Sequence, residues 1–330
     1  MSDQKNDKIL EVKNLKVSYH TYAGEVKSVR GVSFDLKEGE AIAIVGESGC
    51  GKSVTAKSIM GLIKGPQGEI KQGSEILYHG DNILNYNKKQ WQAYKGGEVA
   101  IIFQDALASL NPTMRVGKQI MENLMAHKNM TKDEAKNEAV RMLQKVGIPE
   151  PEKRVRQYPH EFSGGMRQRV MIAIAFACDP KILICDEPTT ALDVTIQGQI
   201  LDIIKELQRE HNTSVIMITH DLGVVANIAQ KIAVMYSGMI VERGNCEDIF
   251  YRPRHPYTWA LIRSVPRLEL ENKQVLASIP GTPPDLLNPP VGCPFCTRCE
   301  YCMEICKEQM PEVTEFGDGH EASCWLHHPL

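Results

Sequence analysis

A glycine-rich turn between an apolar strand and a helix constrains this chain more than any other feature. The apolar run Ala41–Val45 leads into Gly46, Glu47, Ser48, Gly49, Cys50 and Gly51, and then into Lys52, Ser53 and Val54 at the start of a helical segment. Glycines let the backbone N–H groups of such a turn converge, and the helix adds free N–H groups and its positive dipole end. The spacing G-x-x-x-x-G-K-[ST] predicts a cradle for nucleotide phosphates, with Lys52 reaching the β- and γ-phosphates and Ser53 ligating Mg²⁺.

Composition places the chain among folded proteins without a general affinity for nucleic acid. Its 330 residues are 42% hydrophobic and 24% charged, and the net charge is −3. The polar start Met1–Lys8 lacks the apolar core of a signal peptide. The longest apolar run, near Val170–Cys178, is far shorter than the roughly 20 residues of a membrane helix. We expect a cytosolic chain that reaches a membrane only through a partner.

Apolar runs without alternation predict an α/β fold with a parallel, doubly wound sheet, because such strands are covered on both faces. The strands are expected at Ala41–Val45, Val99–Phe103, Lys181–Cys185 and Ser214–Thr219, with helices at Lys52–Ile63, Val170–Cys178 and Ile196–Glu210. Alternating segments at Ile9–Tyr19 and Val29–Leu36 predict an antiparallel β subdomain with one exposed face.

Further elements define the expected domains. Residues 105–169 are predicted to form an α-helical insertion, with helices at Met121–His127 and Lys132–Val146. A hairpin is expected at Ile232–Val241, around Ser237 and Gly238. Residues 1–250 are expected to form the main domain. Residues 251–330 are expected to form a small proline- and cysteine-rich extension with a short helix in HPYTWALIRSVPRL.

Polar residues stand at the C-terminal ends of the expected strands, where such sheets bind ligands. Asp186 can hold Mg²⁺ through its water shell, and Glu187 can polarise a water that attacks the γ-phosphate. His220 can contact the γ-phosphate and hold that water, and Gln104 can reach the water or Mg²⁺. Tyr19 ends a strand and can stack on an adenine ring.

A second phosphate-binding element is predicted before the helix at Val170. Ser163, Gly164, Gly165 and Met166 place a hydroxyl and flexible backbone donors at a helix start. One chain with two such elements predicts a dimer that sandwiches nucleotides between its partners.

These motifs together resemble the ATP-binding subunits of ABC transporters, P-loop NTPases with a RecA-like core, over about Ile9–Glu247. The resemblance implies that Gly46–Ser53 is Walker A, Gln104 the Q-loop and Ser163–Met166 the signature. It implies that Ile182–Glu187 is Walker B, Ala191–Asp193 the D-loop and His220 the switch histidine. Tyr19 matches the residue that contacts adenine. Phe162 and Met166 replace Leu and Gln of the signature, and Cys50 replaces a common Ser, which invites thiol sensitivity. None of these departures removes a backbone donor.

The C-terminal part resembles the extension of dipeptide and oligopeptide importer ATPases. The residues that carry this resemblance are His255–Thr258 (HPYT), Ile279–Leu286 (IPGTPPDL) and the GCPF segment with the cysteines after it. The resemblance implies ATP hydrolysis at the cytoplasmic face of a bacterial or archaeal membrane, with Glu187 as the base and the helical insertion docked on permease loops. It implies as partners a paralogous ATPase subunit or a second copy, two permease subunits and, indirectly, an extracellular peptide-binding protein. Import of nickel, glutathione or another solute remains an alternative, as does, at greater distance, action on ribosomes or DNA.

Six of the ten cysteines lie between Cys293 and Cys324, and in a reducing compartment such a group indicates a metal site. The resemblance implies a [4Fe–4S] cluster on Cys293, Cys299, Cys306 and Cys324. The alternative set Cys296, Cys299, Cys302 and Cys306 has ferredoxin spacing, although Lys307 stands in place of the motif's proline. Zinc held by four cysteines is a third possibility.

Overall fold

The computed structural model describes residues 7–190, 192–265 and 279–328. Contacts divide the chain into two compact units. The first comprises Met1–Asp7, Lys37–Glu40 and Asn85–Met217, and the second comprises Lys8–Leu36, Ala41–Leu84 and Ile218–Leu330. Two sequence interpretations, the polar start up to residue 6 and Ala191 of the D-loop, lie outside the described residues.

The second unit contains the predicted antiparallel sheet, in the order β2-β1-β5-β6 with β4 paired to β1. Its strands are β1 (Lys8–Thr21), β2 (Gly24–Lys37), β4 (Gly68–Ile70), β5 (Glu75–Tyr78) and β6 (Asp81–Asn82). The alternation along β1 changes phase at Asn14, whose φ of 48° lies in the left-handed region. Burial accordingly passes from Leu10 and Val12 to Leu15 and Val17.

A second sheet of the same unit runs in the order β12-β13-β11-β10-β3. Its strands are β3 (Ala41–Val45), β10 (Lys231–Tyr236), β11 (Met239–Asn245), β12 (Thr314–Glu315) and β13 (Glu321–Ala322). All five residues of β3 are buried, and β3 pairs with β10 in parallel, as its unbroken apolar pattern predicts. The predicted hairpin of β10 and β11 is confirmed, and Ser237 (φ 47°) and Gly238 (φ 80°) form its turn.

The helices of this unit are α1 (Lys52–Ile59), α9 (Leu222–Ile228), α10 (Cys246–Tyr251), α11 (Pro256–Arg263) and α12 (Glu304–Glu308). The prediction that the first helix reaches Ile63 is wrong. Helix α1 ends at Ile59 because Gly61 adopts a left-handed φ of 56° two residues later. The short helix expected in HPYTWALIRSVPRL is confirmed as α11.

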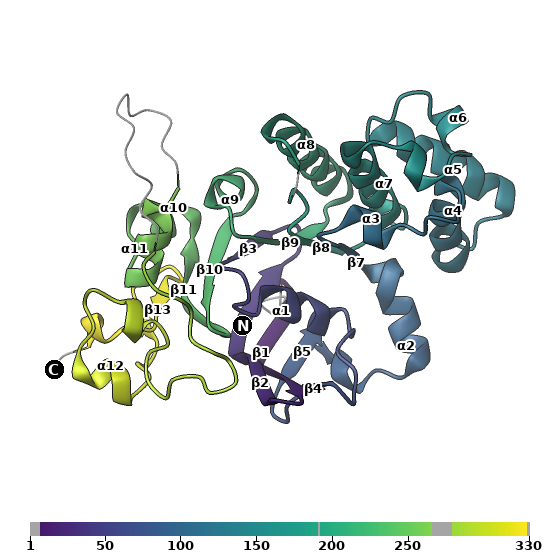
Figure 1. Ribbon diagram of the computed structural model, residues 1–330. Helices are drawn as coiled ribbons and strands as arrows, with labels where there is room; N and C mark the ends of the chain where they lie inside the picture. Colours follow the sequence, from purple (N-terminus) through teal and green to yellow (C-terminus); the bar gives the residue numbers. More distant parts are fainter. Residues whose placement is uncertain (1–6, 191, 266–278, 329–330) are drawn as a thin grey trace, which may run out of the picture. The chain divides into compact units, whose positions relative to one another are not determined.

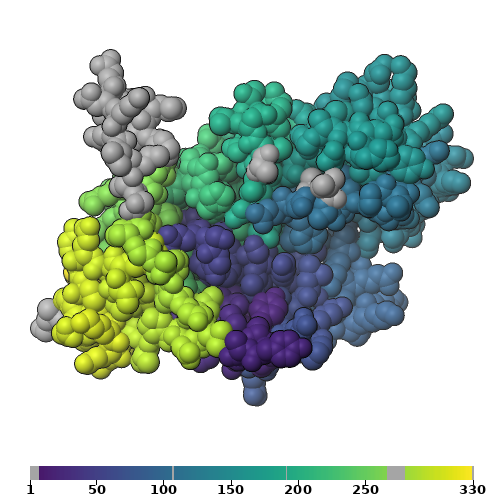
Figure 2. All heavy atoms as spheres, viewed as in Figure 1, coloured from purple at the N-terminus to yellow at the C-terminus, as the bar shows by residue number. Residues whose placement is uncertain are grey.

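The C-terminal extension, which includes α11, packs within this second unit beside β2 and β11 (Figure 1). The backbone N–H of Lys27 on β2 donates to the carbonyl of Leu286 at 2.9 Å. The space-filling view shows the yellow-green residues of the extension lying against the purple N-terminal strands (Figure 2). The extension and the antiparallel sheet belong to one compact unit, and the domain boundary expected between residues 250 and 251 stays a prediction.

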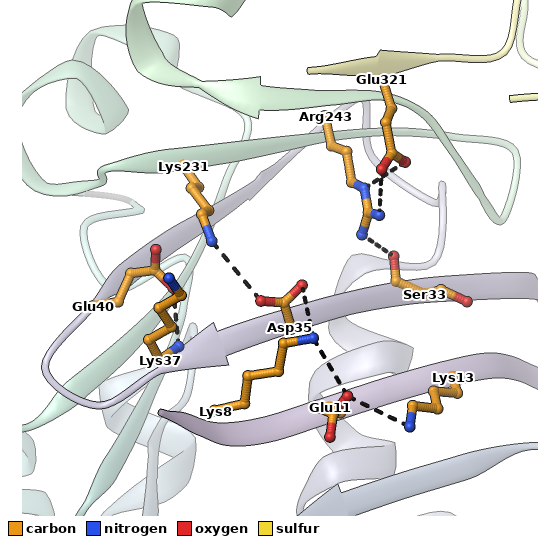
Figure 3. A network of polar contacts seen from close by, with 10 residues as sticks. All are labelled: Lys8, Glu11, Lys13, Ser33, Asp35, Lys37, Glu40, Lys231, Arg243 and Glu321. Atoms are coloured by element: carbon orange, nitrogen blue, oxygen red, sulfur yellow. Dashed lines mark hydrogen bonds and ion pairs between the residues drawn. The ribbon is translucent and has the colours of Figure 1, made fainter. Parts of the chain in front are cut away.

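Two side chains of β11, Glu242 and Arg243, hold the extension through polar contacts. Arg243 donates two hydrogen bonds of 2.8 Å to Glu321 of β13, and Figure 3 shows this pair within a wider network of charges. Glu242, which is 1% exposed, accepts hydrogen bonds from the backbone N–H groups of Arg254 (2.7 Å) and His255 (2.8 Å). The Nε2 atom of His320 lies 2.8 Å from the same carboxylate.

The first unit holds strands in the order β9-β8-β7: β7 (Val99–Ile102), β8 (Ile182–Asp186) and β9 (Ser214–Thr219), the last of which continues beyond the unit at Ile218. Its helices are α2 (Lys88–Ala93), α3 (Ala106–Ser109), α4 (Val116–His127), α5 (Lys132–Lys145), α6 (Pro151–Arg154), α7 (Gly164–Phe176) and α8 (Val194–His211). Helices α4 and α5 pack on each other and on α7 (Figure 1), and α4 begins at Val116, before the expected Met121. The helical insertion over residues 105–169 stays a prediction.

The predicted start of α7 at Val170 is wrong, because the helix already begins at Gly164. Ser163 accepts the Met166 N–H and so caps the helix there. Among the described residues, no helix is long and apolar enough to span a bilayer.

We predict that Glu242→Ala destabilises the fold by about 3 kcal/mol, because two backbone N–H groups and His320 lose a buried partner. Urea denaturation followed by circular dichroism measures this change. The exposed Glu308→Ala serves as the control and is expected to stay within about 0.5 kcal/mol of wild type. Equal midpoints for both variants would contradict the prediction.

Candidate nucleotide-binding site

The phosphate-binding turn approaches neighbouring backbone so closely that two of its positions accept only glycine. Gly46 has a φ of 155°, and a Cβ there would lie 2.1 Å from the carbonyl oxygen of Met235. Gly51 has a φ of 104°, and its Cβ would lie 2.4 Å from the carbonyl oxygen of Ser28. Gly51 is also the N-cap of α1, so the free N–H groups of the helix follow directly.

Lys52 is held at the turn that it is predicted to serve. Its side chain is nearly buried, with 4% of the residue exposed. Its Nζ atom donates to the carbonyl oxygens of Gly46 at 2.8 Å and Glu47 at 2.9 Å. The ammonium therefore lies beside the predicted phosphate cradle.

The expected thiol sensitivity of Cys50 is not supported. The residue is 5% exposed, and burial raises the pKa of its thiol although Lys52 acts in the opposite direction. A buried thiol of raised pKa is a poor nucleophile.

Tyr19 presents a partly exposed ring near the C-terminal end of β1. It pairs with Gly68 of β4, and a Cβ on Gly68 would lie only 3.2 Å from Cε1 of the ring. The absence of a side chain at Gly68 leaves room for the ring, which suits the predicted adenine contact.

In the first unit, the structure brings together the predicted catalytic base and one of the residues predicted to bind Mg²⁺ or water. Gln104, which follows β7, donates from Nε2 to Glu187 Oε2 at 3.1 Å. Thr190 donates to the same oxygen at 3.0 Å. Glu187 has a φ of 50°, a strained conformation that often accompanies function, and it follows the buried Asp186 at the end of β8.

Thr190 is a site residue that the sequence reasoning missed. The available signal was its position three residues after Glu187, which lets a hydroxyl reach back across a turn.

The predicted signature segment forms the first turn of α7. Nothing lies within 4 Å of a Cβ built on Gly164, so this side of the helix start is open. A Cβ on Gly165 would lie 2.9 Å from Ile196 of α8. The buried Gln168 donates to the Pro188 carbonyl at 2.5 Å and so connects α7 to the loop that carries Glu187.

Asp193 caps α8 by accepting the Ile196 N–H at 3.0 Å.

His220 is exposed and follows β9 in the second unit, which also holds Tyr19 and the Gly46–Ser53 turn. Gln104, Asp186, Glu187, Asp193 and the signature segment belong to the first unit, so the predicted site residues form two sets.

Two extension residues that the sequence reasoning did not connect with the site contact Glu47 of the phosphate-binding turn. The Glu47 N–H donates to the Tyr257 hydroxyl at 2.9 Å. Arg298 donates to the two Glu47 carboxylate oxygens at 2.5 and 2.9 Å. These pairs lie 210 and 251 residues apart in the sequence, so no local pattern could indicate them.

The HPYT segment is thereby explained. His255, 1% exposed, accepts the Tyr257 N–H on Nδ1 at 3.0 Å and caps α11. Burial, with a smaller effect of His327, lowers the pKa of His255 to about 3. The neutral ring fixes the helix that presents Tyr257 to the turn.

The cysteine-rich segment gathers thiols in one place. All ten cysteines are free. The Cys293 N–H donates to the Cys306 carbonyl at 2.7 Å, and a Cβ on Gly292 would lie 2.2 Å from that oxygen. Burial, with a smaller contribution from neighbouring thiols, raises the pKa of Cys293 to about 12 and that of Cys324 to about 11.

In type and number, these thiols are sufficient to ligate a thiolate-bound metal centre. The Met303 N–H donates to Cys306 Sγ at 3.5 Å, the kind of hydrogen bond that supports a metal ligand. The part of the chain that the structure describes nevertheless contains no group of three or more His, Cys, Asp or Glu side chains arranged to hold a metal ion.

The fold and the motifs define an ATP-binding cassette. The ABC transporter family model matches residues 29–190, and the model of the oligopeptide/dipeptide transporter C-terminal region matches residues 241–306. The chain is 57% identical over 322 residues to the oligopeptide transport ATP-binding protein OppD of Bacillus subtilis, covering 98% of this chain and 90% of the relative. It is 53% identical to the dipeptide transport ATP-binding protein DppD of the same organism (97% and 95% covered) and 51% identical to OppD of Escherichia coli (98% and 95% covered).

Solved structures agree with this assignment. The ATP-binding cassette MJ0796, solved as a dimer in a post-hydrolysis state bound to ADP and Pi, has a TM-score of 0.64 at 25% identity and covers 72% of this chain and 98% of its own. CbiO1 of Clostridium perfringens, part of the transporter complex cbiONQ, has a TM-score of 0.63 at 28% identity (75% and 92% covered). The chain is an ABC ATPase and belongs to the family of oligopeptide and dipeptide transport ATP-binding proteins.

We predict that His255 makes the fold sensitive to acid. Its folded pKa of about 3 lies below the ordinary 6.5, so below pH 6.5 the unfolded chain binds a proton that the folded chain does not. The stabilisation is complete above 6.5 and is lost toward 3, by about 1.4 kcal/mol per pH unit.

His255→Asn keeps a capping acceptor and removes this titration. Between pH 7.5 and 5 its unfolding free energy should fall by about 2 kcal/mol less than that of wild type, as measured by denaturant titration. The control His160→Asn, at an exposed position, should follow wild type. An unchanged pH dependence in His255→Asn would exclude this role.

Proposed function

We propose that this chain is the ATP-hydrolysing subunit of a membrane importer of dipeptides or oligopeptides. The observation that carries the proposal is the joint match to the ABC transporter model and to the oligopeptide/dipeptide C-terminal region in one chain. Relatives named as oligopeptide and dipeptide transport proteins, matched over nearly the whole chain, support the same cargo class.

In the proposed active state, all site residues except Ser163–Met166 and Asp193 act on the nucleotide bound by their own chain. Tyr19 stacks on adenine, and the Gly46–Val54 segment binds the phosphates through its N–H groups and Lys52. Mg²⁺ neutralises developing phosphate charge when bound, and Ser53, Asp186 and Gln104 are the residues suited to hold it directly or through water.

Glu187 is the proposed general base. It accepts the proton of the attacking water, and Gln104 and Thr190, which donate to its carboxylate, orient it. His220 orients the water and the γ-phosphate. Ser163–Met166, at the open start of α7, and Asp193 are proposed to serve the nucleotide of a neighbouring subunit.

The proposed partners are a second nucleotide-binding subunit, either paralogous or identical, and two integral-membrane permeases that dock on the helices between residues 105 and 169. An extracellular peptide-binding protein acts indirectly, and no nucleic acid is involved. The chain would thus work as a peripheral protein at the cytoplasmic face of the membrane.

We predict that Glu187→Gln lowers ATP turnover by about 100-fold or more, because the amide cannot accept the proton. Turnover is measured as phosphate release by the assembled complex, and binding as retention of labelled ATP with Mg²⁺. Glu187→Gln should still bind ATP, whereas Lys52→Ala should lose binding. Hydrolysis near the wild-type rate in Glu187→Gln would rule out Glu187 as the base.

We also propose that Cys293, Cys299, Cys306 and Cys324 bind a [4Fe–4S] cluster. The supporting observations are six free cysteines between Cys293 and Cys324 and the Met303 N–H that donates to Cys306 Sγ at 3.5 Å. A bound cluster would cross-link these loops and could exchange an electron. The ferredoxin-type set with Cys296 and Cys302, and zinc, are the competing assignments.

Anaerobically purified protein is expected to absorb near 400 nm, roughly where thiolate-bound iron–sulfur clusters absorb, and to lose this absorbance in air. Cys324→Ser should abolish the band and Cys302→Ser should retain it. The reverse pattern would favour the ferredoxin-type set, and a colourless protein with stoichiometric zinc would overturn the cluster assignment.

A further inference from the structure

Arg298 occupies an unusual position between the cysteines and the phosphate-binding turn. It lies in the short turn between Cys296 and Cys299, and its side chain is 2% exposed. The guanidinium contacts the rings of Tyr236 and Phe295, with its carbon 5.8 and 5.9 Å from their centroids. A charged side chain is almost never buried this deeply unless it is paired, so the partners of the guanidinium matter.

All five N–H donors of this arginine have an acceptor. Two bonds go to the Glu47 carboxylate, and Nη1 also donates to the Tyr236 hydroxyl at 3.1 Å. Nε donates to the Pro280 carbonyl at 2.8 Å and Nη2 to the Ile279 carbonyl at 3.2 Å. The fork is therefore fixed in one orientation, and lysine could not reproduce its geometry.

Glu47 in turn is held at each of its polar groups. Its N–H donates to Tyr257, its carbonyl accepts from Lys52 and its carboxylate accepts from Arg298. Glu47 directly follows Gly46, the residue that needs a left-handed backbone to form the turn. The extension thus supplies two of the restraints on this part of the phosphate-binding turn, through Tyr257 and Arg298.

We propose that Arg298 is a positioning residue for nucleotide binding. By holding Glu47 it keeps the Gly46–Ser53 turn in the conformation that binds phosphate, so that the cysteine-rich segment sets the affinity of the ATP site. Preorganisation of this kind lowers the free energy cost of binding. The inference rests on the proposed function of the turn in binding ATP.

A consequence concerns the cysteines themselves. Arg298 shares its turn with Cys296 and Cys299, and the Cys299 N–H donates to the Cys296 carbonyl at 3.5 Å. Any rearrangement of that turn displaces Arg298. Because Arg298 pairs with Glu47, the displacement also moves the phosphate-binding turn. The state of the cysteine-rich segment is thereby coupled to ATP affinity.

The test measures the affinity of the full-length chain for a fluorescent ATP analogue with Mg²⁺. Arg298→Gln and Glu47→Gln are each expected to weaken binding about tenfold, the scale of one lost ion pair at a preorganised site. The double variant should bind the ATP analogue as tightly as the single variant of lower affinity, because both changes remove the same contact. Arg298→Lys should restore only part of the affinity.

Arg243→Gln is the matched control. It removes another two-bond arginine–carboxylate pair of the extension, with Glu321, which does not contact the turn. Its ATP affinity should equal that of wild type even if its melting temperature falls. Circular dichroism melts of all variants separate loss of fold from loss of affinity.

Wild-type affinity in a folded Arg298→Gln, or additive losses in the double variant, would overturn the inference. Should Arg298→Gln fail to fold, Glu47→Gln alone decides, because it leaves the arginine in place. Absence of ATP binding by the wild-type chain would instead refute the proposed function. The two failures are therefore distinguishable.

Discussion

The structure depends on the close approach of the phosphate-binding turn to two strands of its own unit. At Gly46 and Gly51 the backbone passes so near the carbonyls of Met235 and Ser28 that a methyl group would not fit. Met235 lies on β10 and Ser28 on β2, so the turn is fixed between the two sheets of the second unit. A loop held in this way keeps its N–H groups aimed at one point, which is the physical requirement for gripping phosphate.

The C-terminal extension is part of this arrangement. Tyr257 and Arg298 bind Glu47 directly, and the rings of Tyr236, Tyr257 and Phe295 pack together beneath that contact, with centroids 4.5 to 5.3 Å apart. The neutral His255 and the buried Glu242 position α11, from which Tyr257 projects. In this family member, therefore, the extension and the nucleotide-binding turn share one set of restraints.

Much of the fold and of the candidate site could be predicted because its signals are local. The unbroken apolar runs of β3, β8 and β9, the Ser237-Gly238 turn and the Gly46–Ser53 spacing each depend on residues within a few positions of one another. Errors occurred where a single backbone conformation decides, as at Gly61, which shortens α1, and at Ser163, which starts α7 early. The contact between Gln104 and Glu187 required the strand order, because the parallel pairing of β7 with β8 brings the two residues together.

The sequence alone determined the nucleotide motifs, the class of fold and the presence of a cysteine-rich extension. These follow from residue type and short spacing, which fix local backbone geometry and the chemistry available there. Only the tertiary structure decided that Arg298 and Tyr257 hold Glu47, since residues 251 and 210 positions apart meet only after the sheets are packed. Contacts of that kind are selected by the burial of a whole surface, and no short stretch of sequence carries their signature.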